Sequence, residues 1–174
     1  MRRTQFALLL FCILAIPVAA QSDNSSNPVL TASILGRHGT YITKSCLTVY
    51  FDKGYRLERQ GLELGDKPSG KVLDGTLSDQ SFHEIDSMLG SDEFKALATL
   101  EAKSDTGHSQ DLDVWEIIVP RPDKAQRLTY VSRAQQRAEP PKPFMAWFKA
   151  VQKQKAQENK SAPNHCTIQV SQGE

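Results

Sequence analysis

The residues best suited to chemistry lie in the string Arg37-His38-Gly39-Thr40, which follows the apolar residues 32–35. Histidine titrates near neutral pH, and arginine binds oxyanions through its planar guanidinium group. The competing interpretation of this string is a loop with an exposed histidine and a turn glycine. Elsewhere the sequence contains none of the motifs of serine hydrolases, zinc proteases, P-loop proteins or dinucleotide-binding proteins.

Two short segments resemble a known enzyme superfamily. Arg37-His38-Gly39 resembles the R-H-G signature of the histidine phosphatases and phosphoglycerate mutases, and Ser132-Arg133-Ala134 is similar to their second arginine element. This resemblance implies that His38 is a nucleophile and that Arg37 and Arg133 hold a phosphate. The sequence departs from the superfamily, since a strand-rich segment, and not a helix, follows R-H-G. The resemblance makes a small secreted phosphatase-like hydrolase the alternative function.

The N-terminus predicts export. Arg2 and Arg3 precede an apolar run of 11 residues at 6–16, and small residues then lead to a predicted cleavage after Ala20. An 11-residue run is too short to span a hydrocarbon core of about 30 Å as a helix. We expect a secreted or periplasmic protein whose mature chain has no membrane span.

The mature chain has the composition of an ordinary globular domain. The full sequence of 174 residues is 39% hydrophobic and 24% charged, which excludes disordered and collagen-like classes. Removing residues 1–20 leaves 19 basic and 20 acidic residues, and this balance argues against a nucleic-acid partner. We expect a flexible leader at 21–29, a single domain at 30–170 and a tail at 171–174.

The mature chain retains two cysteines, Cys46 and Cys166. In an oxidising compartment such a pair predicts a disulfide, here worth roughly 4–5 kcal/mol in the chain-entropy model. The alternatives weighed are a metal site formed by both cysteines with His165, and a calcium site at Asp105, Asp111 and Asp113. Neither set has the spacing of a known metal site, and we expect no metal or cofactor.

Apolar periodicity predicts the elements that position these residues. Strands are expected at 30–36, 46–51, 55–60, 71–77, 114–119, 128–132 and 166–170. Asp52-Lys53-Gly54 predicts a hairpin turn in which glycine takes the left-handed conformation. Leu47, Val49 and Phe51 are expected on one face of their strand.

Three helices are predicted from capping residues and apolar spacing. Ser78 is the expected N-cap of the first helix, with Leu77 and Phe82 as a hydrophobic staple, and Gly90 ends it. Ser91 is expected to cap a short second helix. The third follows a proline-rich elbow at 138–143 and buries Phe144, Trp147, Phe148 and Val151. The predicted class is α+β, with a mostly antiparallel sheet and two or three helices packed on one face.

A second resemblance covers residues 45–100. The succession S-C-L-T-V-Y-F-D-K-G-Y-R-L-E-R, G-T-L-S-D-Q-S-F-H-E-I-D-S-M-L and D-E-F-K-A-L is similar to small secreted proteins of environmental bacteria, especially of the acidobacterial type. This resemblance implies an envelope location and assigns no activity. The preferred function is a non-enzymatic module that binds a protein or an envelope component. The expected contact residues are Tyr50, Arg56, Arg133 and Arg137.

Overall fold

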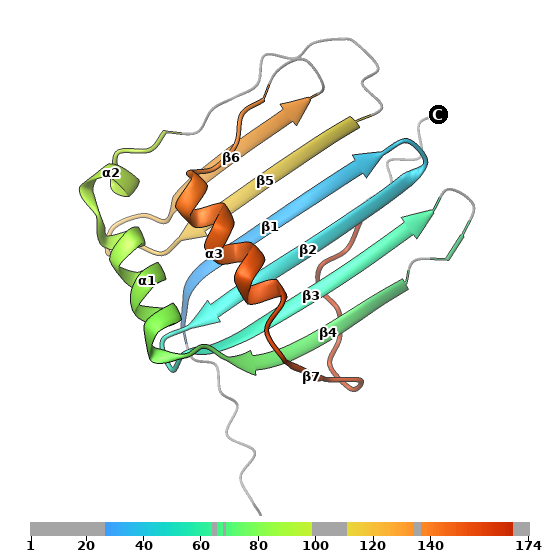
Figure 1. Ribbon diagram of the computed structural model, residues 1–174, viewed down its shortest axis with the longest axis horizontal. Helices are drawn as coiled ribbons and strands as arrows, with labels where there is room; N and C mark the ends of the chain where they lie inside the picture. The colour runs from blue at the N-terminus through green and yellow to red at the C-terminus, as the bar shows by residue number, and fades with distance from the viewer. Residues whose placement is uncertain (1–26, 64–65, 68, 99–110, 134–136, 169–174) are drawn as a thin grey trace, which may run out of the picture.

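The protein forms one antiparallel sheet with helices on one side (Figure 1). The computed structural model describes residues 27–63, 66, 67, 69–98, 111–133 and 137–168. Seven strands lie in the order β6-β5-β1-β2-β3-β4-β7. Their bounds are β1 Pro28–His38, β2 Tyr41–Tyr50, β3 Gly54–Glu63, β4 Ser69–Thr76, β5 Asp111–Val119, β6 Gln126–Arg133 and β7 Gln157–Glu158. The helices are α1 Asp79–Gly90, α2 Asp92–Lys95 and α3 Lys142–Gln152. The predicted α+β class is confirmed.

Strand alternation gives the sheet two unlike faces, because successive side chains point to opposite sides. Ala32 on β1 pairs with Leu47 on β2 and with Ile117 on β5, and all three are fully buried beneath the helices. We call this the helix side. Their neighbours Ser33 and Glu116 point to the other face, which we call the strap side for the chain segment that crosses it.

The core lies between the sheet and the three helices, and α3 contributes its largest fully buried side chains. Phe144, Trp147, Phe148 and Val151 are buried at helical spacing, as predicted. Trp115 of β5 packs edge-on against Phe148, with ring centroids 5.0 Å apart. Aromatic side chains of this size, fully removed from water, contribute the largest apolar areas to a core.

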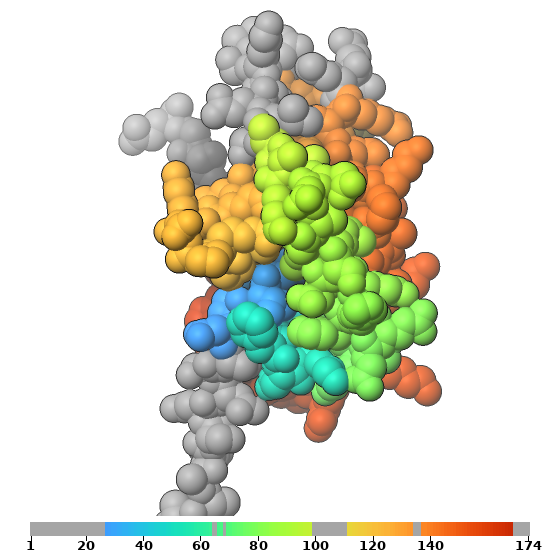
Figure 2. Space-filling model, turned by 90° about the vertical axis from the view of Figure 1, so that its left-hand side faces the viewer, coloured from blue at the N-terminus to red at the C-terminus, as the bar shows by residue number. Residues whose placement is uncertain are grey.

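Helices α1 and α2 lie at one end of the molecule, with the turn between β2 and β3 beside α1 (Figure 2). The Ser78 hydroxyl accepts the backbone N–H of Ser81, and the Ser91 hydroxyl accepts that of Phe94. Both predicted N-caps are therefore confirmed. The Trp147 indole on α3 donates to the Ser81 carbonyl oxygen at 3.0 Å, which joins α3 to α1.

The turn between β2 and β3 differs from the prediction in two ways. The left-handed residue is Lys53, with φ 67°, and not Gly54. Asp52 explains this, because its carboxylate accepts the Gly54 N–H at 2.8 Å and so fixes the turn by a side-chain contact. Phe51 is 67% exposed and lies in the turn, outside the face formed by Leu47 and Val49.

The end of the described chain forms no long strand. β7 pairs with β4 at Asp74 and Leu73, and residues 159–168 then cross the strap side as irregular chain. We call this segment the strap. Residues 166–168 of the predicted strand at 166–170 are not in a strand, and 169 and 170 lie outside the described residues. The prediction is wrong there because side-chain acceptors, and not a neighbouring strand, bind the strap's N–H groups.

The predicted disulfide is present, since Cys46 of β2 is bonded to Cys166 of the strap with their Cα atoms 5.7 Å apart. A disulfide is consistent with an extracytoplasmic location. Within the described part of the chain, no helix is both long and apolar enough to cross a membrane. The first strand starts at Pro28, two residues before the predicted domain boundary, and residues 1–20 lie outside the described residues.

Candidate functional site: a groove beside the strap

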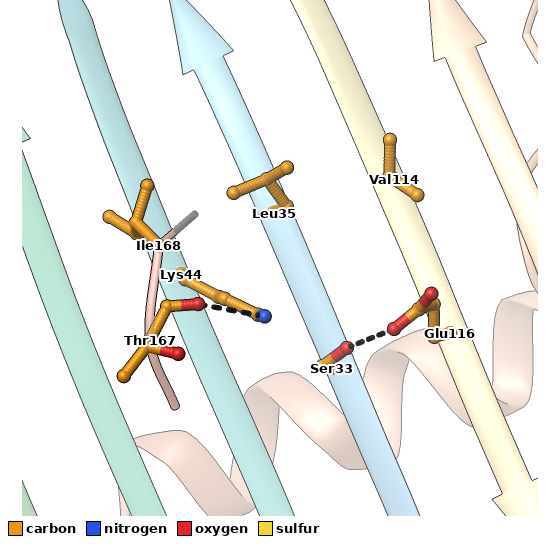
Figure 3. A pocket seen from close by; sticks show the side chains of 7 residues that line it. All are labelled: Ser33, Leu35, Lys44, Val114, Glu116, Thr167 and Ile168. Atoms are coloured by element: carbon orange, nitrogen blue, oxygen red, sulfur yellow. Dashed lines mark hydrogen bonds between the residues drawn. The ribbon is translucent and has the colours of Figure 1, made fainter. Parts of the chain in front are cut away.

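A groove of about 360 Å³ lies between the strap and β5 (Figure 3). Its apolar lining consists of Leu35 from β1, Val114 from β5 and Ile168 from the strap. Leu35 and Val114 are direct cross-strand partners, so they form a continuous floor. The groove has the mixed character of a ligand site, with an apolar floor and a few polar groups at its border.

The wall formed by the strap is fixed by several independent contacts. The Glu58 carboxylate, 7% exposed, accepts the backbone N–H groups of His165 and Cys166, both at 2.7 Å. The Gln60 amide oxygen accepts the N–H of Ile168. These contacts and the disulfide fix the position of the wall, and a wall that is already fixed lowers the entropic cost of binding a ligand.

Opposite charges border the groove. The Lys44 ammonium donates to the Thr167 carbonyl oxygen at 3.0 Å, and the Ser33 hydroxyl donates to the Glu116 carboxylate at 3.4 Å. Figure 3 shows Lys44 next to the strap and Glu116 on the opposite side of β1. Lys44 therefore serves both the strap and the groove.

The groove opens onto a wider surface formed by the strap-side residues of β1, β5 and β6. Across these strands Leu35, Val114 and Val131 are aligned by the sheet register, and all three are half-buried. No helix, and no other strand, of the described chain covers this surface, which we call the open face. The three side chains therefore form a contiguous apolar row that is partly accessible.

The residues of the phosphatase resemblance are divided between the two faces. His38 pairs with Tyr41 and Asp111 on the helix side, whereas Arg37 is on the strap side, as strand alternation requires. Arg133 pairs with Leu112 and is on the strap side with Arg37. The two arginines thus share one face, and His38 lies on the other. The geometry does not support a phosphate held by Arg37 and attacked by His38.

His38 has carboxylates on both sides. Its Nδ1 lies 3.5 Å from Asp111 Oδ1, and its Nε2 lies 3.5 Å from Asp113 Oδ1. A side chain at Gly36 would meet Asp113 and Thr43 at 3.1 and 3.2 Å, so glycine is what lets these groups approach. This negative surrounding disfavours a phosphate dianion at His38. No three His, Cys, Asp or Glu side chains in the described ranges are arranged to hold a metal ion.

The structure also shows where most residues of the two alternative metal sites lie. Cys46 and Cys166 are bonded to each other. His165 donates its backbone N–H to Glu58. Asp105 of the alternative calcium set lies outside the described residues.

The predicted contact residues do not form one site. Tyr50 and Arg56 are on the strap side, at the end of β2 and the start of β3, and Arg137 is exposed after β6. Arg56 donates to Asp74 at 3.0 Å, and Asp74 also accepts from Asn159 of the strap. Arg56 therefore supports the strap.

The electrostatics of this pair follow from its position. The hydrogen bond from Arg56 to Asp74 raises the Arg56 pKa above its ordinary value, and this outweighs the opposing effect of burial. Burial alone would raise the pKa of the Asp74 carboxyl. The hydrogen bonds from Arg56 and Asn159 outweigh that effect and hold the pKa below its ordinary range.

The groove residues themselves were not predicted from the sequence. They come from β1, β2, β5 and the strap, and their proximity depends on a sheet order in which β1 lies between β2 and β5. The sequence contains one signal of this surface, because apolar side chains occur on both faces of residues 114–119. An interpretation of this segment as a buried strand does not separate Val114 and Ile118, which point to the strap side, from the residues of the core.

Comparison with known proteins finds no match to this chain: no protein-family model, no curated protein and no solved structure is significantly similar to it.

Proposed function

We propose that this protein is a non-catalytic module that acts outside the cytoplasm and binds an envelope component or a protein through the open face. The observation that carries the proposal is that the apolar side chains on the two sides of the sheet differ in burial. The helix side is packed with aromatic and aliphatic side chains, whereas Leu35, Val114 and Val131 are only half-buried beside a fixed wall. Burying such side chains against a partner is favourable by about 25 cal/mol per Å².

The location outside the cytoplasm rests on the predicted signal peptide and on the disulfide. The resemblance to small secreted bacterial proteins supports the same location. The hydrolase alternative has less support, because Arg37 and His38 lie on opposite faces of the sheet.

Site-specific photo-crosslinking tests the proposal. A benzophenone amino acid is placed at Val131 on the open face, and in a matched control at Asp86, an exposed position of α1. Each protein is illuminated with an envelope extract of the source organism. We expect an adduct at residue 131 and none at 86. Adducts of equal yield at both positions, or none at 131, contradict the proposal.

An activity assay tests the alternative function, a phosphatase-like hydrolase. The purified mature protein and its His38→Ala variant are assayed with several phosphate esters. We expect no turnover by either protein. Turnover that is lost in His38→Ala would replace the binding module by the hydrolase.

A further inference from the structure

Two arginines flank one leucine on the open face. The register places Arg37 of β1, Leu112 of β5 and Arg133 of β6 in one row across the sheet. Neighbouring strands are about 4.8 Å apart, so the two arginine backbones are separated by about 10 Å. Both side chains leave the same face of the sheet, one on each side of Leu112. Paired guanidinium groups bind phosphate oxygens through charged, bidentate hydrogen bonds.

The adjacent row is apolar. Leu35, Val114 and Val131 lie immediately beside the arginine row in the same three strands. Ile168 of the strap extends this apolar surface at the groove. A ligand that matches both rows carries a phosphate group and an aliphatic chain close to it.

The protein as a whole has a formal net charge of only +1, whereas cations outnumber carboxylates among the described residues of the open face. The strap-side positions of β1, β5 and β6 include the cations Arg37, Arg127 and Arg133 and the carboxylate Glu116, and Lys44 of β2 borders them. Helices α1 and α2, at the end of the molecule shown in Figure 2, carry five acidic residues and one lysine. A flat apolar surface with this excess of cations complements an anionic amphiphile.

We propose that the open face binds an anionic phospholipid, with the phosphate between Arg37 and Arg133 and one acyl chain along Leu35, Val114 and Val131. This inference rests on the proposed function and names the class of its ligand. An acidic protein segment would use the arginines but leave the aliphatic row without a matching partner, so the lipid fits both rows better.

Native mass spectrometry tests the inference directly. The mature protein with its disulfide intact is incubated with vesicles of phosphatidylglycerol or of phosphatidylcholine, and separated from them before measurement. We expect one bound phosphatidylglycerol and little phosphatidylcholine. Arg37→Gln with Arg133→Gln should lower the occupancy at least about tenfold, because charged hydrogen bonds to the phosphate are lost.

A charge-matched control guards against unspecific attraction. Lys142→Gln with Lys149→Gln removes two positive charges from exposed positions of α3 and should leave the occupancy unchanged. Equal losses in both double variants, or equal binding of the two lipids, overturn the proposed site. Arg37→Lys with Arg133→Lys should retain part of the binding, since charge remains while the bidentate geometry is lost.

The outcomes distinguish this inference from the proposed function. If no lipid binds while the benzophenone at Val131 still forms an adduct with a protein, the lipid proposal is wrong and the binding module stands. If no lipid binds and no adduct forms, both proposals are wrong.

Discussion

The two faces of the sheet are built from the same strands, yet different interactions hold what covers them. On the helix side, α3 is held by fully buried side chains such as Phe144 and Phe148. On the strap side, the strap is held by one disulfide, a buried carboxylate and hydrogen bonds to its backbone. Apolar packing therefore holds the helices on the sheet, whereas polar and covalent contacts attach the strap to it.

The two faces also treat buried polar groups differently. Within the described residues, the hydroxyls of Tyr55 and Tyr130 on the helix side are buried without a hydrogen-bond partner, and burial raises the pKa of both. On the strap side, the buried Glu58 carboxylate is satisfied by two N–H groups. An apolar core tolerates an unpaired hydroxyl at a moderate cost, whereas a buried charge needs its partners.

The largest expected difference between the faces lies in stability. Phe148→Ala removes a fully buried ring that packs against Trp115, and should lower the free energy of unfolding by about 3–5 kcal/mol. Val131→Ala, on the open face, should lower it by about 1 kcal/mol or less. Urea unfolding followed by circular dichroism measures both. Similar losses would show that the open face belongs to the core.

The strap depends on its disulfide. Cys46→Ser with Cys166→Ser should lower the free energy of unfolding by about 2–5 kcal/mol, since the bond closes a loop of 120 residues. Hydrogen exchange should then accelerate in the strap before it accelerates in β5. Reduction of the unmodified protein should have the same effect. Equal acceleration in β5 and the strap would contradict the separate attachment of the two faces.

Two carboxylates on the strap side, the buried Glu58 and the exposed Glu116, are expected to differ in their contribution to stability. Glu58→Ala leaves the N–H groups of His165 and Cys166 without their acceptor, and should lower the free energy of unfolding by about 1–3 kcal/mol. Glu116→Ala removes an exposed carboxylate and should change stability by less than about 0.5 kcal/mol. Thermal unfolding of the two variants measures the difference, and equal effects would show that the buried contact does not hold the strap.

The smallest expected effect is a pH dependence on the strap side. Because the Asp74 pKa is lower in the folded protein than in the unfolded chain, its stabilisation is complete above the unfolded pKa and is lost as the pH falls through the folded pKa. The carboxyl is partly exposed, so solvent screening keeps this below about 1 kcal/mol. The stability difference between the unmodified protein and Asp74→Asn should therefore shrink in acid. A constant difference would contradict this role of the carboxylate.

Much of the fold could be predicted because its elements carry local signals. Ser78 and Ser91 mark helix starts by side-chain chemistry that acts within three residues. The alternation in β2 and the helical spacing in α3 likewise identify the buried faces. The disulfide could be predicted because the predicted mature chain keeps two cysteines and its N-terminus has the pattern of an export signal.

The strap and the groove could not be predicted because their contacts are long-range. The bond between Glu58 and the N–H of Cys166 spans 108 positions, and nothing near Cys166 indicates that a carboxylate replaces a neighbouring strand. Leu35 and Val114 are adjacent only because β1 pairs with β5. Arg37 and Arg133 were grouped by resemblance, and the structure places them in the same row for a different reason, the sheet order.

The position of the two tryptophans has a consequence for optical experiments. Trp115 and Trp147 are the only tryptophans of the sequence, and both are buried on the helix side. The strap contains no tryptophan, tyrosine or phenylalanine. Tryptophan emission therefore reports whether the helices are docked, and it remains constant if the strap alone detaches. A fluorescence melt would record one transition in a molecule whose groove has already lost the wall formed by the strap.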